Sequence, residues 1–236
     1  MSSNLSYQWT YARPPVARHK TSRAELSQIV IAFVVLTFDM FLLLIGFGLI
    51  YGDSLRTVVG SASIGIVLLA LAAAFTGFLA HELAHKVVAQ RLGFWAEFRL
   101  SPVGLVLSVF IAAAAGILLA APGATLVGGM DYSERQGWGR TALAGPATNA
   151  GFSVLFYGAA LATFSAGSFL SASLLFLAYI NAWFGAFNLV PVGPLDGAKV
   201  LRWGVGRWAA SFAVLAVLTG LSLAAVSYGT PFLFGR

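Results

Sequence analysis

The 236-residue sequence contains no cysteine and few charged residues. Without cysteine, neither a disulfide framework nor a thiolate metal site is possible, so any zinc would need nitrogen and oxygen ligands. Charged residues make up 9% of the chain and hydrophobic residues 59%, far from the averages of soluble proteins. The Lys and Arg residues flank apolar runs and form no patch interleaved with aromatic residues. The composition therefore indicates a polytopic membrane protein in a lipid bilayer, with no nucleic-acid partner.

Within this apolar background, three ionisable side chains stand together in His81-Glu82-Leu83-Ala84-His85. The chain has three His, and two of them form this pair. Residues four apart lie on one face of a helix, so His81 and His85 can present imidazole nitrogens to one metal ion. Glu82 lies close enough to act on a water at the metal without being a ligand. Such a short pattern also arises by chance, but unpaired polar groups in an apolar segment are costly, which favours metal binding.

Five apolar runs are long enough to cross a bilayer core of about 30 Å as helices. They are 28–51, 62–90, 141–164, 169–191 and 208–228. A sixth run, 102–120, is harder to assign because it is rich in Ala and Gly and leads into Ala121-Pro122-Gly123. We expect an all-α polytopic membrane protein with five to six transmembrane helices and a re-entrant or hairpin segment near the active site.

The distribution of Lys and Arg favours five full spans. With six spans, six of the fourteen basic residues would lie outside, whereas a segment 102–128 that enters the membrane and returns leaves only Arg56 and Arg236 outside. Residues 1–26 are then a cytoplasmic N-terminal tail, and residues 27–236 form a single integral-membrane domain. Non-helical backbone at membrane depth needs protein or water around it, so the re-entrant segment should line a cavity.

A third metal ligand is expected outside the His pair, because zinc usually has three protein ligands. Asp196 is the only acidic residue in the last hundred, and it follows an apolar span that Pro191 and Pro194 interrupt. Taken alone, Leu195-Asp196-Gly197 also fits an ordinary turn. With five spans, however, Asp196 lies on the same cytoplasmic side as the His pair, which favours a role as ligand.

These motifs together resemble the site-2 proteases, a family of intramembrane zinc metalloproteases. The resemblance covers about residues 62–200. It rests on the His81–His85 motif and on two further stretches, Ala144-Gly145-Pro146-Ala147-Thr148-Asn149 and Asn188-x-x-Pro191-x-x-Pro194-Leu195-Asp196-Gly197.

The resemblance implies one zinc ion per chain, held by His81, His85 and Asp196. It implies that Glu82 is the general base, and it suggests Asn188 as a polar group near the substrate or the developing oxyanion. The substrate would be a single-span membrane protein, cleaved within or near its transmembrane segment at a site toward the cytoplasmic side. The extended stretch 124–129 could pair with the unwound substrate.

Two other functions stay open. A membrane metal-ion or proton transporter could use the same His/Glu/Asp cluster, but it predicts further polar residues along a path, and Asp39 is the only other candidate. For Asp39 we favour a structural pairing. The second alternative is a catalytically silent relative that acts as a binding or scaffold protein. Glu82 argues against it, because such a protein would not need a general base. Asn149 and Asn181 face the helix bundle, where helix–helix hydrogen bonding explains them as well as catalysis does.

Overall fold

The computed structural model describes residues 21–50, 64–116, 118, 122–129, 134–163 and 169–233, and its described part is mostly helical. Helices α3, η1 and α4 follow one another without a break, η1 being a π-helical turn. The helices are α1 (Arg23–Ile50), α3 (Ile64–Ala74), η1 (Phe75–Leu79), α4 (Ala80–Arg91), α5 (Pro102–Ala115), α6 (Arg135–Ala162), α7 (Phe169–Asn188), α8 (Asp196–Trp203) and α9 (Val205–Leu233). The strands are β1 (Trp95–Leu100) and β2 (Gly123–Gly128).

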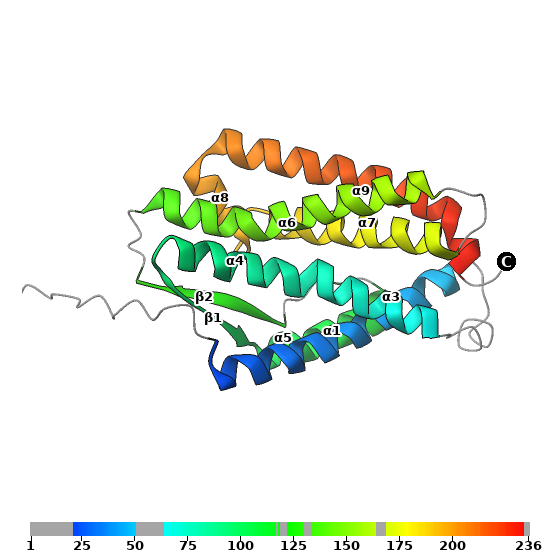
Figure 1. Ribbon diagram of the computed structural model, residues 1–236, viewed down its shortest axis with the longest axis horizontal. Coiled ribbons are helices and arrows are strands. Elements are labelled where there is room, and N and C mark those ends of the chain that lie inside the picture. Colours follow the sequence, from blue (N-terminus) through cyan, green and yellow to red (C-terminus); the bar gives the residue numbers. More distant parts are fainter. Residues whose placement is uncertain are drawn as a thin grey trace, which may run out of the picture.

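The long helices run side by side, whereas α8 and the strands lie toward one end of the bundle (Figure 1). Four helical segments within the described residues are long and apolar enough to cross a membrane: Arg23–Ile45, Ile64–Arg91, Phe169–Asn188 and Val205–Ser227. They correspond to four of the five predicted spans. The fifth predicted span, 141–164, lies in α6, which is equally long but carries buried polar residues such as Asn149 and Ser153.

The expectation of an all-α fold is wrong in one respect, because β1 and β2 form a two-stranded antiparallel sheet. In its register Trp95 lies opposite Gly128, and Leu100 opposite Gly123. Exposed backbone groups at a sheet edge need partners, above all in a protein surrounded by lipid. The extended stretch predicted at 124–129 corresponds to β2. No local pattern predicted β1, whose outer edge is paired with a helix distant in the sequence.

Helix α1 covers the outer edge of β1. The Phe98 amide donates to Oε1 of Glu25 at 3.0 Å, and the Leu100 amide donates to Oε1 of Gln28 at 2.9 Å. Glu25 is fully buried and also pairs with Lys86 of α4, whose Nζ lies 2.6 Å from Oε2. These contacts leave β2 as the edge of the sheet that α1 does not cover.

The predicted run 102–120 folds in part as α5. This helix begins after Ser101, whose hydroxyl accepts a hydrogen bond from the Gly104 amide at 3.1 Å, and it ends at Gly116 with φ +63°. Its 14 residues span about 21 Å, less than a bilayer core of about 30 Å. Because Leu100 pairs with Gly123, the chain between the strands leaves the sheet and comes back to it.

Helix α1 begins at Arg23, so the last residues of the predicted tail 1–26 belong to the helix. Residues 1–20, Arg56 and Arg236 lie outside the described residues. Asp39 of α1 is fully buried, and neither carboxylate oxygen has a hydrogen-bond partner among the described residues. Ser108 of α5 lies close enough to interact with this carboxylate, so the structural pairing that we favoured for Asp39 stays a prediction.

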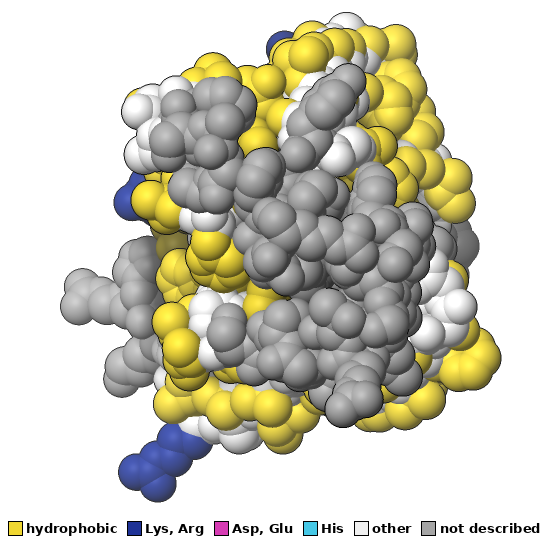
Figure 2. All heavy atoms as spheres, turned by 90° about the vertical axis from the view of Figure 1, so that its right-hand side faces the viewer, with side chains coloured by type: hydrophobic (Ala, Val, Ile, Leu, Met, Phe, Trp, Pro, Cys, Tyr) yellow, Lys and Arg dark blue, Asp and Glu magenta, His cyan; other side chains and the backbone are white. Residues whose placement is uncertain are grey.

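Basic side chains lie toward the end of the bundle that carries α8 and the sheet. They include Arg91 in the last turn of α4, Arg135 at the start of α6, Arg202 in α8 and Arg207 at the start of α9. Figure 2 looks onto the opposite end, where the described side chains are mainly hydrophobic and Lys or Arg lie at the rim of the view. Among the described residues, these basic side chains therefore gather toward the end with α8 and the sheet.

Candidate metal centre

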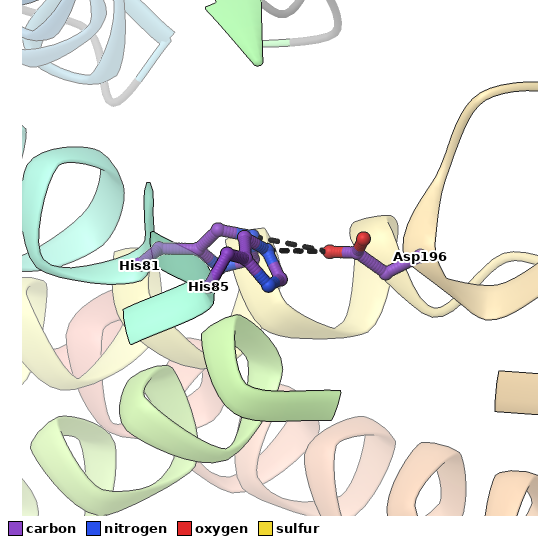
Figure 3. Close-up of side chains that lie close together, drawn as sticks. All are labelled: His81, His85 and Asp196. Carbon is purple, nitrogen blue, oxygen red and sulfur yellow. Dashed lines mark ion pairs between the residues drawn. The ribbon is translucent and has the colours of Figure 1, made fainter. Parts of the chain in front are cut away.

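The fold brings His81, His85 and Asp196 together, as the sequence predicted. One ligand atom from each lies within 4.8 Å of the others. Nε2 of His85 lies 2.9 Å from Oδ2 of Asp196, and Nε2 of His81 lies 3.3 Å from the same oxygen. The two imidazoles reach from α4 toward the carboxylate at the start of α8 (Figure 3). All three residues are buried.

The opposite nitrogens of the two imidazoles are held by hydrogen bonds. Nδ1 of His81 lies 2.6 Å from Oδ1 of Asn149, and Nδ1 of His85 lies 2.7 Å from the backbone oxygen of Thr141. A carbonyl oxygen can only accept, so each Nδ1 carries the hydrogen in a neutral ring. Each Nε2 faces Asp196 and is the nitrogen left to bind a metal when the ring is neutral.

Asn149 is itself oriented by its neighbours. Its amide nitrogen donates to the Gly77 carbonyl at 2.9 Å and to Oδ1 of Asn181 at 3.1 Å, which leaves Oδ1 of Asn149 as the acceptor for His81. Gly77 belongs to η1, and π-helical turns leave backbone carbonyls available because they alter the usual helical bonding. Of the two roles that the sequence left open for Asn149, helix–helix hydrogen bonding and catalysis, the structure shows the first, since Asn149 of α6 bonds to η1 and α7. It also holds His81, which the sequence did not predict.

Gly145 of α6 provides the space in front of the two imidazoles. A Cβ at this position would lie 2.5 Å from Nε2 of His81 and 2.5 Å from Nε2 of His85. Two imidazole nitrogens and a carboxylate that lie within 4.8 Å of one another suit zinc, whose usual ligands include His nitrogen and Asp oxygen. Zinc would therefore be held by His81, His85 and Asp196.

Asp196 has the charge that a metal ligand needs. Burial raises the pKa of its carboxyl group, but the neighbouring His85 and His81 outweigh burial and hold this pKa well below its usual range. Nζ of Lys199 lies 3.3 Å from Oδ1 of Asp196. The carboxylate is therefore ionised, and an ordinary turn in which Asp bonds its own backbone does not describe it.

Glu82 and Asn188 lie in the wall of a cavity of about 430 Å³ that also includes His85 and Asp196. Glu82 is outside the group of three ligand residues, and its Oε2 accepts hydrogen bonds from the amide and the hydroxyl of Thr125, both at 2.8 Å. The Asn188 side-chain amide donates to the Phe184 carbonyl of its own helix at 2.9 Å. An amide nitrogen carries two hydrogens, so one bond to Phe184 leaves the other for a substrate.

Comparisons with known proteins show what this chain is similar to. Residues 162–226, which include Asn188 and Asp196, match the family model described as Peptidase family M50. A candidate zinc metalloprotease of Methanocaldococcus jannaschii is 37% identical over 147 residues, which cover 62% of this chain and 76% of that protein. A candidate zinc metalloprotease of Mycobacterium tuberculosis is 35% identical over 162 residues, which cover 62% of this chain and 36% of that protein. No solved structure matches the chain.

Proposed function

Because this chain belongs to peptidase family M50, the site-2 protease family, we propose that it hydrolyses peptide bonds within or near the transmembrane segments of membrane proteins. Membership of this family and the named relatives identify the chain as a zinc metalloprotease. Its long apolar helices indicate a membrane protein. The observation that carries the finer proposal is the buried group of His81, His85 and Asp196 at the end of apolar helices, open to a cavity.

The side chains around the metal centre support this chemistry. Zinc, when bound, acts as a Lewis acid on a carbonyl and lowers the pKa of a bound water to about 7. Glu82 lies in the same cavity as His85 without belonging to the ligand group, as a general base requires. Its carboxylate would take a proton from the attacking water and give it to the leaving amine. The second N–H of Asn188 would donate to the developing oxyanion.

The sheet supports binding of the substrate as an extended strand. Along a strand of an antiparallel pair, the backbone N–H and C=O groups of successive residues point alternately toward the partner strand and away from it. The Phe98 amide of β1 points away from β2, toward Glu25. The amide of its register partner Thr125 therefore points away from β1, and so do the amides of Gly123 and Val127, two residues to either side. Both of these line the cavity beside the metal centre. A transmembrane helix hides its carbonyls in internal bonds, so an unwound substrate could pair with this edge.

The charge distribution supports an orientation with the N-terminus and the metal centre toward the cytoplasm. Basic residues gather at the end of the bundle that carries α8, and the positive-inside rule places that end in the cytoplasm. Helix α4 ends and helix α6 begins at this end (Figure 1). We infer that the segment between them, with β1, α5 and β2, enters the membrane and returns, because α5 is too short for a full span.

The test is cleavage of a tagged single-span membrane protein in liposomes by wild type and by Glu82→Gln, with bound zinc measured in both. We expect about one zinc per chain in both proteins, chelator-sensitive cleavage by wild type, and a loss of at least roughly 100-fold in rate for the variant. Glu134→Gln, which removes a carboxylate outside the cavity, is the matched control.

Two outcomes would contradict the proposal. Bound zinc without cleavage of any of a panel of membrane substrates by wild type would favour a transporter or a silent relative. Absence of bound zinc would overturn the assignment of His81, His85 and Asp196 as ligands.

A further inference from the structure

The contact between Glu82 of α4 and Thr125 of β2 joins the metal centre to the sheet. Oε2 of Glu82 lies 2.8 Å from the Thr125 amide nitrogen and 2.8 Å from its Oγ1. Oγ1 also lies 3.1 Å from the backbone oxygen of Glu82. A hydroxyl has one hydrogen, and a carboxylate is a stronger acceptor than a neutral carbonyl. Two donors of one residue therefore converge on a single carboxylate oxygen.

The other carboxylate oxygen, Oε1, has no hydrogen-bond partner among the residues that the structure describes. Glu82 lines the same cavity as His85 and Asp196. A carboxylate with one oxygen anchored and the other open to a cavity is restricted in rotation but still able to accept a proton.

The direction of the Thr125 amide is set by the sheet. Thr125 lies opposite Phe98, whose amide points away from β2 and bonds to Glu25 at 3.0 Å. Thr125 must therefore point its own amide out of the opposite edge, toward Glu82. Glu25 is fully buried and paired with Lys86, so its bond to Phe98 fixes the outer edge of β1, the strand that pairs with Thr125.

We propose that Thr125 is a positioning residue for the general base. It holds Oε2 of Glu82 through its amide and hydroxyl, so that Oε1 faces the water that attacks the substrate. This inference rests on the proposed function, since it gives Glu82 the role of base. It adds a second role for β2 beside pairing with substrate.

The test compares wild type with Thr125→Val and Thr125→Ser in the liposome cleavage assay. Valine has the shape of threonine but lacks the hydroxyl, and the backbone amide stays. We expect Thr125→Val to lower kcat by roughly 10- to 100-fold, the usual effect of losing a hydrogen bond to a charged group, and to leave KM unchanged. Thr125→Ser restores most of kcat. Bound zinc stays at the wild-type value, and the thermal midpoint in detergent falls by no more than the loss of one hydrogen bond explains.

Thr219→Val is the matched control, because its hydroxyl donates to the Leu215 carbonyl at 2.7 Å within α9, outside the cavity. We expect this variant to keep the wild-type kcat. A loss of activity similar to that of Thr125→Val would show a general effect of removing a partly buried hydroxyl.

Three other outcomes would overturn the inference. A wild-type kcat for Thr125→Val would show that the hydroxyl has no role. A higher kcat would show that Thr125 holds Glu82 back until substrate displaces it. A raised KM with unchanged kcat would assign Thr125 to substrate binding. In each case an inactive, zinc-bound Glu82→Gln variant leaves the proposed function intact, whereas an active one contradicts the proposed function itself.

Discussion

Replacement of Gly145 by alanine should strongly weaken zinc binding. The added Cβ would lie 2.5 Å from Nε2 of His81 and 2.5 Å from Nε2 of His85. Each distance is about 0.9 Å shorter than the 3.4 Å at which ordinary contacts begin, so both rings would have to move. The methyl group would also crowd the two nitrogens that would hold zinc.

The expected loss follows from this geometry. Disturbing only the groups that orient metal ligands commonly weakens metal affinity by about 10- to 100-fold. A methyl group that displaces two ligands should weaken it by more than about 100-fold. The measurement is zinc per purified chain, followed by titration with a competing chelator, together with cleavage of the single-span substrate.

Gly151→Ala is the control on the same helix, since a Cβ there meets nothing within 4 Å. This variant should bind zinc and cleave substrate like wild type. A Gly145→Ala protein that holds one zinc per chain with wild-type affinity would refute our assignment of the metal position.

Two further predictions concern groups around the site. Asn149→Leu removes the acceptor for Nδ1 of His81 and should weaken zinc binding by about 10- to 100-fold in the chelator titration. Asn149→Asp keeps an acceptor oxygen and should lose less, and equal losses in the two variants would contradict this role. Lys86→Met leaves the fully buried Glu25 carboxylate without its partner and should lower the free energy of unfolding in detergent by about 3–5 kcal/mol. Glu25→Gln/Lys86→Met, which removes the buried charge and keeps an acceptor for the Phe98 amide, should lose less.

Sequence patterns predicted most of the helices and the extended stretch that forms β2, but they missed β1. Long apolar runs are a local property, so four of the predicted spans correspond to helices that are apolar enough to cross a membrane. The strand 95–100 carries charged side chains and gave no comparable signal. Its Glu97 and Arg99 pair with each other at 2.6 Å, and its outward amides bond to side chains of α1 more than seventy residues earlier.

The metal ligands could be predicted because their signal is local or compositional. His81 and His85 share a face through helix geometry alone, and Asp196 stands out because acidic residues are so scarce in the last hundred. The sequence also indicated the membrane environment, through its apolar runs and the placement of Lys and Arg.

The groups that hold these ligands were decided by tertiary structure. The bonds from His81 to Asn149 and from His85 to Thr141 join residues 68 and 56 positions apart, and Thr125 lies 43 positions from Glu82. Nothing in the sequence around either partner specifies such a contact, since it depends on how helices and strands pack. Local geometry therefore determines which residues can bind zinc, and packing determines their tautomers, the space in front of them and the direction of the base.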